Sequence, residues 1–284
     1  MSLALECLSL GCLLALCAVS FSLIYSVLRI TNFALQAQIS VAAYVCYYLH
    51  VHLGIGAATA ILLAILLGGL FGVAQYFVVF RRMLGSPSES IVIASLGVSL
   101  IIEAIILLLA GSRTLSLGMS DDVVTLGTQR LYVRDIGLFS LLVISVPLLV
   151  LFLKKGSYGL MARAIPTNLR QLLVWGRPVD GPVALVFFLA YALSSAAGVF
   201  IGVGWEVSPA MGFKWGLWSF GVAVVGGLGS VYGAVAGAAI FSIPLVLAYR
   251  FSGALFADAA LFVGMTIVLL VSPAGLLPLR LRRF

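Results

Sequence analysis

Residues 154–180 read KKGSYGLMARAIPTNLRQLLVWGRPVD and separate two long apolar runs. The first 24 residues of this segment hold five basic side chains and no acid, in a chain of which only 9% is charged. Lys and Arg beside membrane spans are retained on the cytoplasmic side. The segment also predicts a helix of its own, because Pro166 suits a first helical turn and Gly176 followed by Pro178 ends a helix. We therefore predict a cytoplasmic loop that contains a short helix.

This predicted helix is amphipathic. Leu169, Leu172 and Leu173 fall on one stripe, and Arg163 and Arg170 supply the basic character. Such a helix suits the surface of a lipid bilayer and a groove in another protein about equally well. The sequence pattern alone leaves both interpretations open.

The composition indicates a membrane protein. The chain has 284 residues, 63% of them hydrophobic, and a mean hydropathy of +1.24. That leaves too little polar surface to coat a soluble globule. Several runs reach the ~20 residues that a membrane-spanning helix needs, and they lack the alternation of a β-barrel. We predict an all-α polytopic membrane bundle that forms a single transmembrane domain over residues 1–284.

The apolar runs predict eight membrane spans and one shorter re-entrant or half-membrane helix before Gly226. The net charge of +7 lies at the ends of the spans, so it fits membrane lipids with anionic headgroups and not nucleic acid. Arg280, Arg282 and Arg283 place the C-terminus in the cytoplasm, and we favour an outside N-terminus. The approximate spans are 5–28, 34–49, 54–80, 86–110, 136–153, 182–203, 231–249 and 258–271.

The second apolar run begins with unusual polarity. Arg29, Asn32, Gln36 and Gln38 stand where a helix in hydrocarbon would be apolar. They form either a turn at the membrane surface or a break in the second helix that lines a pathway. We favour the broken helix, since Gln36 and Gln38 lie beyond any turn.

Two further features have both a functional and a structural interpretation. Glu103 lies about fifteen residues into the fourth run, about 22 Å from its start at 1.5 Å per residue. An acid at that depth either contacts substrate or a proton, or holds the bundle together. Gly226, Gly227, Gly229 and Ser230 form a flexible segment that either packs helices closely or lines and gates a passage.

Catalytic and metal-binding patterns are missing from the sequence. It holds no zinc-protease, hydrolase or dinucleotide-binding motif, and no phosphate-binding loop of the type GxxxxGK[ST]. The four cysteines lie in apolar surroundings without the spacing of metal ligands. We expect neither an enzyme nor a cofactor or metal site in this chain, so any energy from ATP comes through a partner.

Four stretches together carry a resemblance to a known family. They are SLIYSVLRITNFA at 22–34, SPSESIVIASLGVS at 86–99, GLMARA at 159–164 with Leu169, Arg170 and Gly176, and VGGLGSVYGA at 225–234 followed by SPAGL at 272–276. In this order and spacing the chain resembles the LivH-type permease subunits of ABC importers for branched-chain amino acids, over nearly its whole length.

The resemblance implies a multi-pass subunit of the bacterial inner membrane that works by alternating access. It implies a second related permease, two cytoplasmic ABC ATPases that carry ATP and Mg²⁺, and a periplasmic substrate-binding protein. It implies a coupling helix for the ATPases at Arg163, Ala164, Leu169, Arg170, Leu172, Leu173 and Gly176. The residues that we expect in the substrate pathway or gate are Asn32, Phe33, Gln36, Glu103, Gly226, Gly227, Gly229 and Ser230.

The chain also departs from the family pattern. Leu35-Gln36-Ala37 stands where the family usually has His-Gly, which argues against an ordinary leucine-type specificity. The resemblance implies a branched-chain amino acid or a similar small polar solute as cargo. Pro166-Thr167-Asn168 replaces a segment often made of alanine and acids, and Pro166 is expected to restart the coupling helix there. The alternative function is an ion- or proton-coupled secondary transporter or channel that uses Glu103.

Overall fold

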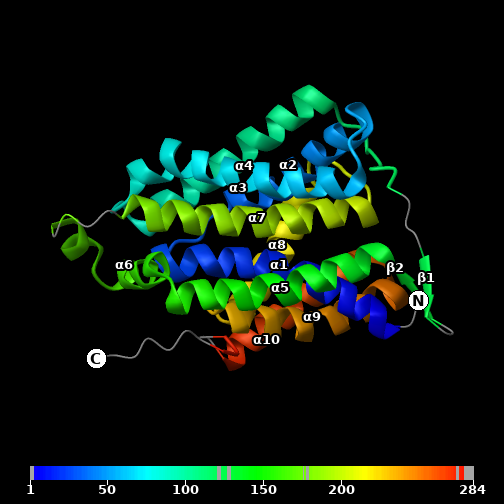
Figure 1. Cartoon of the computed structure of the whole chain (residues 1–284). Coiled ribbons are helices and arrows are strands. Elements are labelled where there is room, and N and C mark those ends of the chain that lie inside the picture. The colour runs from blue at the N-terminus through cyan, green and yellow to red at the C-terminus, as the bar shows by residue number, and fades with distance from the viewer. Residues whose placement is uncertain are drawn as a thin grey trace.

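The computed structural model describes residues 3–119, 123–126, 129–174, 176, 179–272 and 275–277. These residues form a bundle of helices with one short β-ribbon (Figure 1). The elements are α1 (Leu3–Leu28), α2 (Ala34–Tyr47), the π-helical turn η1 (Tyr48–His52), α3 (Ala57–Val78), the 3-10 turn η2 (Phe80–Met83), α4 (Ser88–Ala110), β1 (Val123–Leu126), β2 (Gln129–Tyr132), α5 (Val133–Lys155), α6 (Ser157–Val174), α7 (Asp180–Gly204), α8 (Met211–Gly226), α9 (Val231–Ser252) and α10 (Ala254–Val271).

The predicted helical class is confirmed, but the predicted number of eight spans is not. Among the described residues, six helices are long and apolar enough to cross a membrane: α1, α3, α4, α5, α7 and α9. α2 has 14 residues and α8 has 16, both short of the ~20 that a span needs. α8 occupies the place of the predicted short helix before the glycines, and α2 is one continuous helix over most of the predicted second run.

α1 forms the centre of the bundle. It packs against α7 and α9, and 83% of its most apolar window is buried, compared with 11% for α5. Helices α3, α4 and α5 instead present apolar side chains outward, such as Leu62, Ile101 and Ile144. Outward leucine and isoleucine suit lipid, where the hydrophobic effect gives no reason to bury them further.

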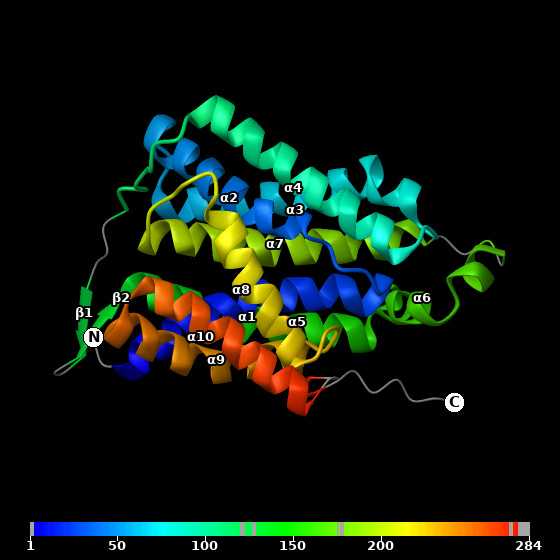
Figure 2. The same ribbon diagram turned by 180° about the vertical axis from the view of Figure 1, so that it is seen from behind.

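The two ends of the bundle differ in charge. Figure 2 shows α6 at one end and the β1–β2 ribbon at the opposite end, where α1 also begins. The helix ends near α6 carry Arg29, Arg81, Arg82, Lys154 and Lys155. The β-ribbon pairs Val123–Leu126 with Gln129–Tyr132 in antiparallel register, a detail that the helical prediction did not contain.

The predicted start of the loop helix is wrong. α6 begins at Ser157, directly after an extended Gly156, and Pro166 lies inside it, so Pro166 does not restart a helix. The helix starts earlier because Ala162 and Ile165 are buried against the bundle and fix the upstream turns. Its predicted end holds at Gly176, whose φ of 66° is the left-handed conformation that terminates helices. Pro178 lies outside the described residues.

Candidate functional site

The predicted break within the second helix is wrong, because α2 is continuous from Ala34 to Tyr47 and the irregular backbone is the connection from Arg29 to Phe33 that precedes it. After α1, Arg29 takes a φ of 58°, and regular helix resumes only at Ala34. The backbone N–H of Phe33 donates to Ser95 Oγ of α4 at 3.0 Å, and the N–H of Ala34 donates to Asn32 Oδ1 at 3.0 Å. Irregular backbone at membrane depth needs such internal partners, because lipid supplies none. These hydrogen bonds hold the irregular connection in place inside the bundle.

A buried polar chain runs across the bundle at this connection. Asn32 Nδ2 donates to the Tyr191 hydroxyl of α7 at 3.1 Å, and that hydroxyl donates to Gln75 Oε1 of α3 at 2.7 Å. All three side chains are buried. Tyr191 follows Asp180, the first residue of α7, by eleven residues, or about 16 Å along the helix. The polar chain thus lies deep inside the apolar bundle.

The first turns of α2 and α8 meet beside this polar chain. A Cβ on Gly216 of α8 would lie 3.0 Å from Gln36 Cα, so only glycine allows this approach. Ser40 Oγ donates to the Pro209 carbonyl at 2.9 Å and accepts from the Gly212 N–H at 2.9 Å. Within the described chain, Gln36 Oε1 is buried without a hydrogen-bond partner. Two short helices therefore begin together inside the bundle next to an unsatisfied polar atom.

Glu103 is not part of this arrangement. It is partly exposed on α4, and among the described residues no hydrogen bond or ion pair reaches it. Its helix neighbours Ile102 and Ile106 pack against α2 at Ala37. The role of Glu103 as a substrate or proton contact stays a hypothesis.

The glycine segment after α8 is closely packed. Gly227 and Gly229 have φ values of 105° and 87°, and Ser230 Oγ caps α9 by accepting from the Gly233 N–H at 3.1 Å. The segment after α10 packs on this loop, since the backbone N–H groups of Leu276 and Leu277 donate to the carbonyls of Val225 and Gly226. These contacts favour the packing interpretation of the glycines. Their role in a gate stays a prediction.

The residues predicted for coupling lie on or just beyond α6. Arg163 and Ala164 are exposed, Leu172 is half-buried against the core, and Gly176 is exposed. Arg163 Nη2 donates to the Lys154 carbonyl at 3.4 Å, which ties α6 to the end of α5. Leu169, Arg170 and Leu173 belong to the helix backbone, but their side chains lie outside the described part.

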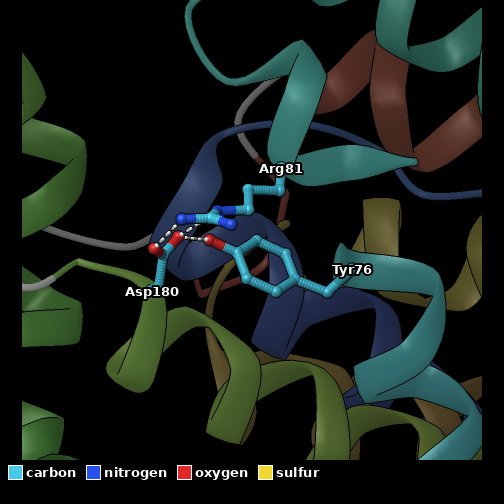
Figure 3. Close-up of polar contacts among 3 residues, drawn as sticks. All are labelled: Tyr76, Arg81 and Asp180. Carbon is cyan, nitrogen blue, oxygen red and sulfur yellow. Dashed lines mark hydrogen bonds and ion pairs between the residues drawn. The ribbon is translucent and has the colours of Figure 1, made fainter. Parts of the chain in front are cut away.

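Sequence reasoning missed a polar cluster directly after the coupling loop (Figure 3). Asp180, the first residue of α7, accepts from Arg81 Nε at 3.1 Å and from Arg81 Nη2 at 2.8 Å. It also accepts from the hydroxyl of Tyr76, a fully buried side chain of α3, at 2.7 Å. A bidentate Arg–carboxylate pair fixes geometry as well as charge. The available signal was an acid in the first turn of a span that follows a basic loop.

The Asp180 cluster and the buried polar chain share helix α3. Tyr76 bonds to the start of α7 at Asp180, and its neighbour Gln75 bonds deeper in α7 at Tyr191. Two adjacent residues therefore fasten α3 to α7 at two depths. The deeper bond continues to Asn32 and the connection before α2.

A polytopic helical protein with short helices, an irregular connection and buried polar groups inside the bundle has the architecture of a membrane transport protein. The chain belongs to the family described as "Branched-chain amino acid transport system / permease component", whose model matches residues 3–272. This membership confirms the resemblance found in the sequence. It also places the chain among transport subunits rather than enzymes.

Individual relatives agree along nearly the full length. The chain is 26% identical to the high-affinity branched-chain amino acid transport system permease protein LivH of Salmonella typhimurium, over 95% of this chain and 92% of that protein. It is 25% identical to the corresponding permease protein BraD of Pseudomonas aeruginosa, over 95% and 93%. It is 26% identical to a probable branched-chain amino acid transport permease protein LivH of Methanocaldococcus jannaschii, over 93% and 86%. No solved structure matches the chain.

Proposed function

We propose that this chain is the permease subunit of an ATP-driven importer for an amino acid or a similar small polar solute. The observation that carries the proposal is the connection before α2, where Asn32, Tyr191 and Gln75 place hydrogen-bonding groups deep in an apolar bundle. Polar groups at this depth are uncommon in membrane bundles and mark polar passages or moving joints. The printed names of the relatives support a branched-chain amino acid as cargo.

Helix α6 is the coupling helix in this proposal. Two cytoplasmic ABC ATPases, which carry ATP and Mg²⁺, dock on its exposed side at Arg163 and Ala164. Movement of α6 then reaches α7 through the short connection at Gly176 and Asp180. The bidentate pair of Asp180 with Arg81 makes α3 move with α7, and Tyr191 passes the displacement to Asn32 in the connection before α2. The chain itself performs no covalent chemistry.

The orientation follows from the charge asymmetry. The end with α6 carries the basic helix ends and faces the cytoplasm under the positive-inside rule, which also puts the C-terminus inside. The start of α1 lies at the opposite end and therefore outside (Figure 2). The proposed partners are a second related permease in the bacterial inner membrane and a periplasmic binding protein that delivers cargo to the outer end.

The test is an affinity purification of this chain from its host in mild detergent, with stoichiometry by mass spectrometry. We expect an ATPase with a phosphate-binding loop to accompany the native chain and to be lost when Arg163 and Arg170 are both changed to Glu. The matched control is Arg82→Glu, which reverses an exposed charge at the same end of the bundle but outside α6. A chain that purifies without any ATPase contradicts the proposal.

A transport assay separates the proposal from the ion-coupled alternative. We expect uptake in vesicles to continue under an uncoupler while ATP is maintained, and to stop when ATP is removed. Uptake that collapses with the uncoupler and with Glu103→Gln would favour the secondary transporter.

A further inference from the structure

A segment that follows α4 pairs with the connection from α7 to α8, at the end of the bundle opposite α6 (Figure 2). The segment consists of residues 111–119, and we call it the outer strap. Leu115 and Val207 exchange both backbone hydrogen bonds, each 2.9 Å long, in an antiparallel bridge. Leu117 is only 1% exposed, although most of the strap is exposed. The strap is thus fastened by a backbone bridge and by a fully buried leucine.

The side chain of Leu117 lies at the outer end of the contact between α2 and α7. A Cβ on Gly202 of α7 would be 2.8 Å from Leu117 Cδ1 and 3.0 Å from Val207 Cγ2. The same Cβ would be 3.2 Å from Ala43 Cβ of α2. Leu117, Val207 and Ala43 therefore converge on one glycine, which allows this close approach. Because the strap around it is exposed, Leu117 separates this junction from the outer surface.

One face of α2 leads from this junction inward to Gln36, whose Oε1 has no hydrogen-bond partner among the described residues. Gln36, Ser40 and Ala43 are spaced by four and three residues, so they lie along the same face of the helix. Ala43 is about 10 Å further out than Gln36, at 1.5 Å per residue. Ser40 lies between them and bonds to the connection before α8 and to the start of α8. A row of residues that begins at an unsatisfied polar atom therefore ends beneath Leu117.

Two glycines leave the strap free to move. Gly111 and Gly118 have φ values of 75° and 61°, in the left-handed region that other residues disfavour. A Cβ on either glycine would meet nothing within 4 Å, so both turns are open to their surroundings. A cavity of about 720 Å³ between α2, η1 and α4 has Leu115 in its wall, which gives the released strap room to shift. The strap can therefore leave when the bridge opens and Leu117 withdraws, with no helix repacked.

We propose that the outer strap is the outer gate of the passage through this subunit and that the structure shows the gate closed. With Leu117 in place, the row that starts at Gln36 is blocked on the outer side, and the bridge to Val207 holds the connection that leads into α8. Release of both contacts opens the row to cargo that arrives from outside. Elements that move in a working cycle are held by few buried contacts, as this strap is. The inference rests on the proposed function, because a gate requires a passage.

Thiol labelling in spheroplasts tests the gate without a transport measurement. Gln36→Cys places a thiol at the inner end of the row, and a membrane-impermeant methanethiosulfonate is added from outside. Leu117→Ala in this background removes the side chain at the gate. The matched control is Leu138→Ala near the outer start of α5, which truncates a leucine that is 2% exposed. The unsubstituted chain measures the background from its own four cysteines.

We expect Leu117→Ala to raise the labelling rate of the Gln36→Cys thiol by at least about tenfold, because the closed state loses a buried leucine side chain that the open state does not use. Leu138→Ala should leave the rate unchanged. No rise with Leu117→Ala, or an equal rise with both leucine variants, overturns the proposal.

A reversible lock provides a second measurement in the assembled importer. Leu115→Cys combined with Val207→Cys joins the two partners of the bridge. Such partners have Cα atoms about 5.5 Å apart, and disulfides span ~4.4–6.8 Å between Cα atoms. We expect the oxidised importer to lose ATP-driven uptake of leucine and reduction to restore it, while each single variant transports under both conditions.

Equal uptake by the oxidised and reduced forms, with the disulfide verified by mass spectrometry, would contradict the gate. If the reduced importer takes up no leucine with ATP, the proposed function fails in this assay and the labelling result alone decides the gate.

Discussion

The hydroxyl of Tyr191 is the best single atom with which to test the buried polar chain. Tyr191→Phe removes only this oxygen, and the ring keeps its place because it is fully buried and stacked on Phe187 at 5.9 Å. Two hydrogen bonds disappear, one from Asn32 Nδ2 at 3.1 Å and one to Gln75 Oε1 at 2.7 Å. Both amides stay behind in the interior without that partner.

The expected cost follows from these two losses. Hydrogen bonds between membrane helices contribute about 0.6 kcal/mol on average, and a buried polar group left unsatisfied costs about 1–3 kcal/mol. Two average bonds set a lower bound of about 1 kcal/mol and two stranded amides an upper bound of about 6 kcal/mol, so we expect the free energy of unfolding to fall by about 1–6 kcal/mol. This value applies when no water enters the small space that the hydroxyl oxygen vacates.

The assay is reversible unfolding in mixed dodecylmaltoside–SDS micelles, followed by fluorescence. Tyr232→Phe on α9 is the matched control, since its side chain is 57% exposed. In the Gln75→Leu background, Tyr191→Phe should lower the free energy of unfolding by at least about 1 kcal/mol less than it does in the native chain, because residues in one network do not act additively. A Tyr191→Phe variant within about 0.5 kcal/mol of the Tyr232→Phe control would refute the reasoning.

Three further changes test other parts of the structure. Gly198→Ala should destabilise the protein by about 1–3 kcal/mol, because the added Cβ would lie 2.9 Å from backbone atoms of α2. The control Gly97→Ala lies on an open helix face and should be neutral or stabilise by up to about 1 kcal/mol. Similar effects of the two changes in the same unfolding assay would argue against this packing. Asp180→Asn should change the free energy of unfolding by less than about 1 kcal/mol, because the side chains of Arg81 and Asp180 are 54% and 41% exposed. The same change should reduce the amount of solute transported per ATP hydrolysed in the assembled importer. An unaltered ratio would show that the pair does not transmit movement from α6. Pro166→Ala should slow amide hydrogen exchange in the middle of α6, because alanine restores the N–H that proline lacks, and unchanged exchange would show that the proline does not weaken this helix.

The sequence was sufficient for features that depend on local composition. Long apolar runs predicted the helical class and included the six long helices. The polarity of Gln36 and Gln38 predicted a break in the second helix, but α2 is continuous through both residues. Both glutamines are indeed buried, at 2% and 0% exposure. Local composition failed at Pro166, because the burial of Ala162 and Ile165 extends α6 upstream of the proline.

The partners of the buried polar groups were beyond the reach of sequence reasoning. Asn32 and Tyr191 are 159 residues apart, and Arg81 and Asp180 are 99 apart. Periodicity tells which side of a helix is apolar, but it does not tell which helix lies opposite. For the same reason the bridge between Leu115 and Val207 was not predicted, since it joins the loops that follow α4 and α7.

The central position of α1 has a consequence for how the protein is made. α1 leaves the ribosome well before its neighbours α7 and α9, which begin only at residues 180 and 231. At a synthesis rate of ~5–20 residues per second, α1 waits about 10–30 s for α7. During that interval the faces of α1 that later contact α7 and α9 are exposed to lipid. The mean hydropathy of α1 is 2.4, and a helix that is apolar all round is stable both in lipid and in a protein core. α1 thus serves first as a membrane anchor for the nascent chain and later as the core around which the other helices assemble.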